Sequence, residues 1–261
     1  MLGTGNAVVT ECYNTCFVLK DNDEYFLVDG GGGNAILRQL KYAGVDWRKV
    51  QHIFVTHKHL DHIMGIMWLV RMICQYSKWN KYEGVARIYA SPDVTQVISR
   101  IAHLLLRDDE VCYLGNTLLL IPIEDRKSFQ IINHSITFFD INSIQTQQFG
   151  FYVDDKKLVY CGDEPCNEVT ETLIKGCEWL IHEAFCLYSE VDIFKPYEKH
   201  HSTVKDACEL AQRCGVQKLV LVHTEDKNIN NKKALYLEEG SRYFSRKLFV
   251  PIDLDVITVQ G

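Results

Sequence analysis

The stretch that decides the fold is IFVTHKHLDHIMG, which occupies residues 53–65. It opens on three apolar residues, and such a run of branched and aromatic side chains predicts a short buried strand. Four candidate metal ligands follow within six positions, and they are His57, His59, Asp61 and His62. Side chains two positions apart in extended chain share a face, so His57 and His59 point the same way and the later pair turns toward a second centre. Neutral imidazole together with carboxylate favours zinc, manganese or iron over calcium or magnesium.

The composition is that of an ordinary globular protein. An apolar share of 47% over 261 residues is enough for a substantial core. The net charge of −6 argues against a protein that coats nucleic acid, although it leaves a local basic groove open. Ten cysteines without a CxxC pair or a signal peptide indicate reduced thiols, which predicts a cytoplasmic protein. No run of 18 apolar residues occurs, so we expect no membrane span.

Apolar periodicity predicts alternating strands and helices along the chain. Between residues 7 and 28 the pattern predicts three strands, which are AVVT at 7–10, TCFVL at 15–19 and YFLVD at 25–29. Helical spacing is expected at 34–43 and 63–74, and Pro92 suits the first turn of another helix. The final stretch, 248–259, is expected to add a closing strand or two.

Six further motifs follow one another along the chain. They are LGTG at 2–5, FLVDGGGG at 26–33, CGDE at 161–164, HEA at 182–184, HST at 201–203 and VHT at 222–224. With the HxHxDH pattern of residues 57–62, they resemble the motifs of the metallo-β-lactamase superfamily, most of all its ribonuclease Z and phosphodiesterase branch. The resemblance covers nearly the whole chain. It implies one α/β hydrolase domain over residues 1–261, folded as a four-layer αββα sandwich with the site at one edge.

The resemblance also implies two divalent ions, which we expect to be zinc, with manganese or iron as alternatives. Asp163 follows a predicted strand, and the family uses this carboxylate to bridge both ions. The first centre would take His57, His59 and Asp163, and the second would take Asp61, His62, Asp163 and His223. The resemblance makes Asp29 a residue that orients a ligand histidine. Glycines 30–33 lack the spacing of a phosphate-binding loop, so we interpret them as a flexible turn.

The first centre departs from the family pattern. The family has a further histidine shortly before an aromatic-glycine-aromatic triplet, here FGF at 149–151, but the matching region offers Asn142 and Ser143. His134 lies eight residues before Asn142, about 26 Å along an extended strand, and so at the wrong end of that strand. The ligand shell of the first centre can be completed in several ways: by water, by the Asn142 amide oxygen, by another nearby polar group or by a substrate phosphate. We expect weaker binding at this centre.

For catalysis, the resemblance implies hydrolysis of a phosphodiester by a metal-bound hydroxide. Asp61 and Asp163 would position the hydroxide, while His201 protonates the leaving alkoxide and Glu183 holds the imidazole. The same arrangement of ions could also hydrolyse an amide or a lactam. The HEA and HST motifs favour phosphodiesters.

The substrate stays open between RNA 3′ ends and a small or cyclic nucleotide. Ribonuclease Z-like proteins carry a tRNA-gripping arm between the FGF-like and GD motifs, whereas only eleven residues separate Phe151 from Asp163 here. The alternatives are hydrolysis of another small-molecule ester and a non-catalytic metal- or ligand-binding module. Homodimers are common among the proteins that this sequence resembles, so a homodimer is possible.

Overall fold

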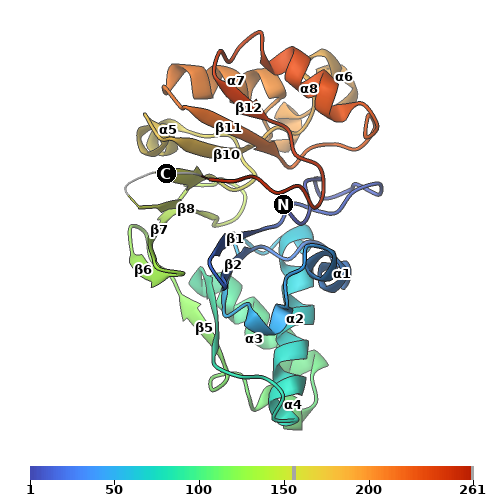
Figure 1. Ribbon diagram of the computed structural model, residues 1–261, viewed down its shortest axis with the longest axis vertical. Coiled ribbons are helices and arrows are strands. Elements are labelled where there is room, and N and C mark those ends of the chain that lie inside the picture. The colour runs from blue at the N-terminus through green and yellow to red at the C-terminus, as the bar shows by residue number, and fades with distance from the viewer. Residues whose placement is uncertain (155–156, 260–261) are drawn as a thin grey trace.

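The computed structural model describes residues 1–154 and 157–259, and it contains two sheets stacked face to face with helices on both outer sides (Figure 1). One sheet has the strand order β1-β2-β3-β4-β5, and its strands are Phe17–Asp21, Glu24–Val28, His52–Phe54, Ala86–Ala90 and Leu118–Pro122. The other has the order β12-β11-β10-β9-β8-β7-β6. Numbered from β6 to β12, its strands are Ser128–Ile131, His134–Asp140, Phe149–Val153, Leu158–Tyr160, Trp179–Glu183, Lys218–Val222 and Lys247–Phe249.

The helices divide between the two outer faces. Those beside the first sheet are α1 (Ala35–Tyr42), α2 (Leu60–Lys78), α3 (Pro92–Leu105) and α4 (Asp108–Val111), with the 3₁₀ turn η1 (Trp47–Lys49). Those beside the second are α5 (Glu168–Ile174), α6 (Val191–Phe194), α7 (Val204–Arg213) and α8 (Lys232–Gly240), with the 3₁₀ turns η2 (Tyr188–Glu190) and η3 (Tyr197–Lys199). The chain therefore has the expected four-layer αββα fold.

Strand direction determines where the chain leaves each sheet. In the first sheet β1 and β2 pair antiparallel, and β2 to β5 pair parallel. In the second sheet β9 to β12 are parallel, whereas β6 to β9 alternate in direction. Parallel neighbours end at the same edge of a sheet. The segments that follow β9, β10 and β11 therefore emerge side by side.

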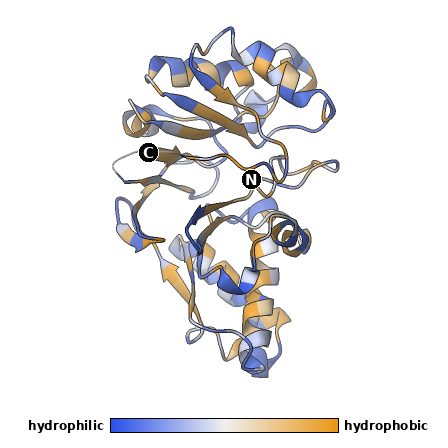
Figure 2. Cartoon of the chain, in the orientation of Figure 1, coloured by the Kyte–Doolittle hydropathy of each residue, from blue (hydrophilic) through white to orange (hydrophobic). Residues whose placement is uncertain are grey.

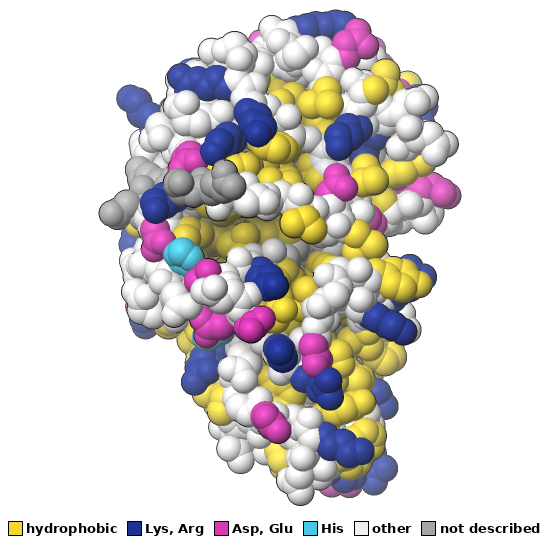
Figure 3. Space-filling model, in the orientation of Figure 1, with side chains coloured by type: hydrophobic (Ala, Val, Ile, Leu, Met, Phe, Trp, Pro, Cys, Tyr) yellow, Lys and Arg dark blue, Asp and Glu magenta, His cyan; other side chains and the backbone are white. Residues whose placement is uncertain are grey.

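The central strands are apolar on both faces because one face meets helices and the other meets the opposite sheet. In β2, Leu27 packs among the helices while Phe26 and Val28 face the second sheet. In β9, Val159 likewise faces helices, while Tyr160 faces the first sheet. Figure 2 shows the result as strands that are largely hydrophobic and helices with one hydrophobic face. On the outside, Lys and Arg side chains are intermixed with Asp and Glu on the face drawn in Figure 3.

The layer between the sheets is rich in aromatic side chains. Phe26 meets Phe151 with ring centroids 5.5 Å apart, and Phe54 meets Phe138 at 4.8 Å. Each pair joins a strand of the first sheet to a strand of the second. Aromatic contacts of this kind add about 0.5–1.5 kcal/mol each beyond the area they bury. The two sheets are thus held together by directional as well as hydrophobic contacts.

The N-terminal end of the sequence differs from expectation, whereas the closing strand expected near the C-terminal end is present. Residues 7–10 form a turn and a bend, so the strand expected there is wrong. The preceding backbone instead reaches across the molecule, since Asn6 N donates to Thr224 O at 2.9 Å. The closing segment contributes only the short β12, after which Leu254 N donates to Met1 O at 3.0 Å. At the N-terminal end, a backbone hydrogen bond to a distant segment therefore takes the place of the expected strand. No helix of the described residues is long and apolar enough to cross a bilayer.

Candidate functional site

The candidate ligands come from both sheets. The first sheet supplies the segment after β3, where the buried strand continues through Val55 and then gives way to α2. His59 is the N-cap of this helix, with extended φ and ψ of −64° and 150°, and Asp61 lies in the first turn. A carboxylate there is favoured by the unpaired backbone N–H groups at the helix start. The second sheet supplies Asp163 after β9 and His223 after β11.

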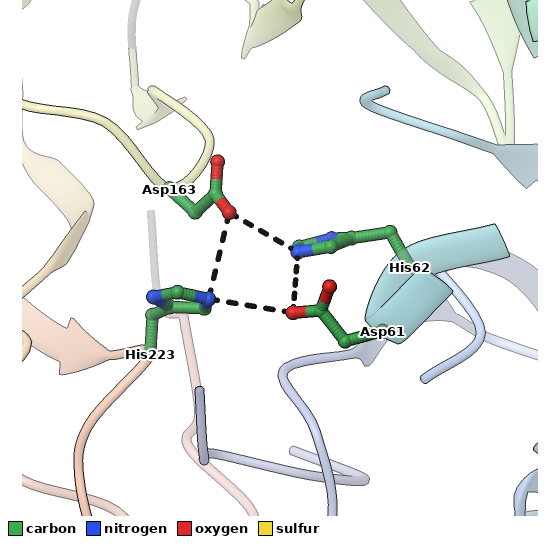
Figure 4. A group of neighbouring side chains, drawn as sticks. All are labelled: Asp61, His62, Asp163 and His223. Atoms are coloured by element: carbon green, nitrogen blue, oxygen red, sulfur yellow. Dashed lines mark ion pairs between the residues drawn. The ribbon is translucent and has the colours of Figure 1, made fainter. Parts of the chain in front are cut away.

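Four buried side chains form the first group close enough to hold an ion. They are Asp61, His62, Asp163 and His223, and their ligand atoms all lie within 4.8 Å of one another (Figure 4). Nε2 of His62 lies 3.2 Å from Oδ2 of both Asp61 and Asp163. Nε2 of His223 lies 3.6 Å and 3.4 Å from the same two oxygens. The expected second centre is therefore brought together from elements of both sheets.

The second group is His57, His59 and Asp163, whose ligand atoms also lie within 4.8 Å of one another. Nε2 of His57 lies 2.8 Å from Nδ1 of His59 and 3.6 Å from Oδ2 of Asp163. His57 and Asp163 are buried, while His59 is exposed. Because Asp163 belongs to both groups, its position is that of the shared carboxylate that the sequence predicts.

The residues behind these groups hold the imidazoles in place. Oδ2 of Asp29 lies 2.8 Å from Nδ1 of His62, as expected for an orienting carboxylate. The Thr56 hydroxyl donates to Oδ2 of Asp29 at 2.9 Å and lies 2.9 Å from Nδ1 of His57. Since each ring uses Nδ1 in these contacts, Nε2 is left to face the group.

Backbone conformation at two of these positions is unusual. Asp29 and His223 both have φ of +57°, a left-handed conformation that side chains other than glycine, asparagine and aspartate rarely adopt. Both residues are buried. Such strain costs of order 1–3 kcal/mol per residue and is found mainly at functional sites.

The electrostatics suit cation binding. Burial opposes ionisation of Asp61, but His62 and His223 outweigh it and lower its pKa. Burial likewise opposes ionisation of Asp163, yet His57, His62 and His223 keep its pKa well below the usual value. Burial lowers the pKa of His57 to about 3. Ionised carboxylates and neutral imidazole are the forms that bind metal ions.

Unpartnered buried atoms give an independent test of fit to a metal ion. Within the described part of the chain, Nε2 of His62 and Nε2 of His223 are buried without a hydrogen-bond partner. An orphaned polar atom in the interior costs about 1–3 kcal/mol. A divalent cation would satisfy both atoms, so the residues present fit the zinc, manganese or iron that the sequence indicates.

The position of the missing histidine is corrected by the structure. Asn142 is exposed, with φ of +55°, and its backbone N–H donates to Oδ1 of Asp140, whereas the candidate ligands other than His59 are buried. His134 starts β7 and contacts Asp154, far along the strand from the site. The side chain that does reach the site is Gln148, which is 1% exposed and donates from Nε2 to Oδ1 of Asp163.

The sequence did not indicate Gln148, because the comparison with the family pattern pointed to Asn142 and Ser143, at the end of the preceding strand. The chain between Asp140 and Phe149 is irregular and bends at residues 144–146, so Gln148, directly before the triplet, returns to the site. One signal in the sequence could have indicated Gln148. It is a polar residue directly before the apolar FGF triplet, at a position where the strand is expected to be buried.

A third group adjoins the second centre and contains Glu183, His201 and His223. Nδ1 of His201 lies 3.7 Å from Oε2 of Glu183, and the ring stacks on Phe185 with centroids 4.7 Å apart. The Ser202 N–H donates to the other carboxylate oxygen, Oε1. Burial, reinforced by His223, lowers the pKa of His201 to about 4, and burial raises the pKa of Glu183 to about 7. At 3.7 Å the two groups form no hydrogen bond, so the Glu183 carboxyl does not offset the effect of burial on the His201 pKa.

Comparisons with known proteins agree with this geometry. The model of the family described as Anti-Pycsar protein Apyc1 matches residues 1–247. The ribonuclease Z of Thermococcus sibiricus is 26% identical, with 98% of this chain and 94% of that protein covered. The metallo-β-lactamase fold protein YhfI from Bacillus subtilis has a TM-score of 0.75 at 17% identity, covering 97% of this chain and 95% of that one. Human tRNase Z, short form, has a TM-score of 0.73 at 22% identity, covering 100% and 98%. The chain belongs to the Anti-Pycsar protein Apyc1 family, and it is similar to ribonuclease Z in sequence and to metallo-β-lactamase fold proteins in structure.

Proposed function

We propose that the chain is a metal-dependent phosphodiester hydrolase and that its substrate is a small or cyclic nucleotide. The observation that carries the proposal is that three groups share residues: Asp163 joins the two candidate metal centres, and His223 joins the second centre to the Glu183–His201 pair. The candidate metal ligands and His201, the candidate proton donor, therefore lie next to one another. The ribonuclease Z relatives, which cover almost the whole chain, support phosphodiester chemistry.

Two ions at these positions would supply Lewis-acid chemistry, lowering the pKa of water and neutralising phosphate charge. Asp61 and Asp163 would orient the attacking water by accepting its hydrogen bonds. We assign to His201 the role of donating a proton to the leaving alkoxide. Substrate binding that closes the 3.7 Å gap to Glu183 would raise the His201 pKa toward neutrality, because a hydrogen-bonded carboxylate favours the imidazolium.

The size of the substrate is inferred from the connection between β8 and β9. Only residues 154–157 join these strands, which leaves no length for a projecting arm at the place where the ribonuclease Z pattern has one. RNA 3′ ends remain the second candidate because the ribonuclease Z relatives match nearly end to end.

The test is turnover by the zinc- or manganese-loaded chain of three substrates: bis-p-nitrophenyl phosphate, a 3′,5′-cyclic nucleotide and a 3′-extended tRNA. We expect hydrolysis of the first two and little cleavage of the third. His57→Ala should remove most activity and keep the fold, whereas His103→Ala, on the exposed face of α3, should change nothing. Full activity in His57→Ala would refute the assigned site, and cleavage of tRNA alone would overturn the choice of substrate.

A further inference from the structure

Gln148 occupies a position at which its side chain touches both candidate centres. Its Nε2 donates to Oδ1 of Asp163 and lies 2.9 Å from Nδ1 of His57. The residue directly precedes β8, whose backbone is fixed by pairing with β7 and β9. A side chain anchored in this way can hold the shared carboxylate in one orientation.

The chemistry of the amide fixes which end faces the site. An ionised carboxylate only accepts hydrogen bonds, so the atom facing Asp163 is the amide nitrogen. The oxygen, Oε1, packs against Gly162, where an added Cβ would lie only 2.6 Å away. It is buried and has no hydrogen-bond partner among the described residues. An amide nitrogen has no free lone pair for a cation, so Gln148 in this orientation is not a ligand.

The consequence for Asp163 concerns its second oxygen. With Oδ1 held by the amide, Oδ2 is the atom that faces Nε2 of His57, His62 and His223, at 3.6, 3.2 and 3.4 Å. One oxygen is therefore presented to both centres. The His57 centre has three candidate side-chain ligands, whereas the Asp61 centre has four.

We propose that Gln148 is a positioning residue that holds the Asp163 carboxylate without binding metal itself, and that the two centres are consequently unequal. This inference rests on the two-ion site of the proposed function. Structural zinc sites have four protein ligands and are closed, whereas catalytic sites have three and leave one coordination position to water or substrate. The His57 centre is the weaker of the two, and its ion depends on Gln148 for the orientation of Asp163.

Zinc titrated calorimetrically into the chelator-treated full chain tests the proposal. The wild type should bind two equivalents in separate steps. Gln148→Met keeps the volume and removes the donor, and it should weaken the second step about 10- to 100-fold, the range for loss of a group that orients a ligand. Gln148→His supplies an imidazole at this position and should bring the second step close to the first.

The neighbouring residue provides the matched control. Gln147 is exposed and donates to Oδ2 of Asp140 at 3.1 Å, so Gln147→Met should give the wild-type isotherm. Urea unfolding in chelator separates the roles, because a merely structural glutamine would lower stability and leave zinc affinity unchanged. If Gln148→Met does not fold, Gln148→Asn, which keeps the amide but shortens its reach, should show the same weakening.

Two results would overturn the proposal: equal zinc affinities at both steps in the wild type, or wild-type isotherms in Gln148→Met and Gln148→Asn. Neither depends on turnover. A chain that binds two zinc ions in unequal steps but hydrolyses no phosphodiester would refute the proposed function and leave the assignment of Gln148 standing.

Discussion

At the scale of single residues, the buried Glu183 carboxyl makes stability depend on pH. Burial raises its pKa from 4.5 to about 7, so the native chain holds a proton that the unfolded chain releases at lower pH. The stabilisation is present below pH 4.5 and is lost as the pH rises through 7. Glutamine mimics the protonated acid, so Glu183→Gln should match the wild type near pH 4 and exceed it by roughly 3 kcal/mol near pH 8.

Urea unfolding of the chelated proteins across this pH range measures the difference. Glu209→Gln, on the exposed surface of α7, serves as the control and should follow the wild type throughout. A pH-independent difference between wild type and Glu183→Gln would show that Glu183 is ionised in the native state. Turnover should fall in Glu183→Gln, because the amide cannot stabilise an imidazolium at His201 as a carboxylate does.

At the scale of elements, the glycine turn after β2 is packed against α2 and is not the flexible turn that the sequence indicated. A Cβ on Gly65 would lie 1.8 Å from the Gly30 oxygen. Gly30 N also donates to His62 O at 2.9 Å, which ties the turn to the helix that carries two candidate ligands. Alanine usually stabilises a helix by about 1 kcal/mol relative to glycine, but here the overlap should make Gly65→Ala destabilising by about 1–3 kcal/mol.

Gly33 lies in the same turn and gives the control, because nothing is within 4 Å of a Cβ there. Gly33→Ala should leave the urea midpoint nearly unchanged, while Gly65→Ala should lower both the midpoint and the zinc affinity. An increase in stability for Gly65→Ala would mean that the turn moves freely away from α2.

At the scale of the whole molecule, the candidate site joins the two sheets. His57 and His62 follow β3 of the first sheet, whereas Asp163 and His223 follow β9 and β11 of the second. Ions bound between them stabilise only the assembled sandwich, by RT ln(1 + [L]/Kd), or about 2.7 kcal/mol at a hundredfold excess over Kd. We therefore expect a chelator to lower the melting temperature while the transition stays single, in keeping with our prediction of one domain over residues 1–261.

Calorimetry with and without chelator measures this effect, and the ratio of calorimetric to van't Hoff enthalpy tests whether the transition is single. Phe54→Ala, which removes a ring from the layer between the sheets, should lower stability by about 3–5 kcal/mol and keep one transition. Two separate transitions in either sample would show that the sheets unfold independently.

Much of the site was predictable because ligand-bearing motifs are local. His57, His59, Asp61 and His62 lie on one short segment, and their grouping follows from strand-to-helix geometry. The apolar strands are recognisable because both faces of each sheet are covered. The sequence by itself therefore determined the apolar strands and the order of the candidate ligands along the chain, and its motifs determined the αββα architecture through their resemblance to a known superfamily.

Tertiary structure alone decided which side chain reaches the place of the missing histidine. The path of residues 141–148 depends on contacts outside that segment, since Asn167 donates to the Ile141 oxygen at 2.6 Å and Phe149 N donates to Thr56 O at 3.1 Å. Spacing along the chain could suggest Asn142, but these long-range bonds, together with the bond from Ile141 N to Gln148 O at 3.0 Å, bring Gln148 against Asp163. The same reason applies to residues 7–10 and to Gly65, because a hydrogen bond or a close approach between distant segments leaves no periodic signal in the sequence.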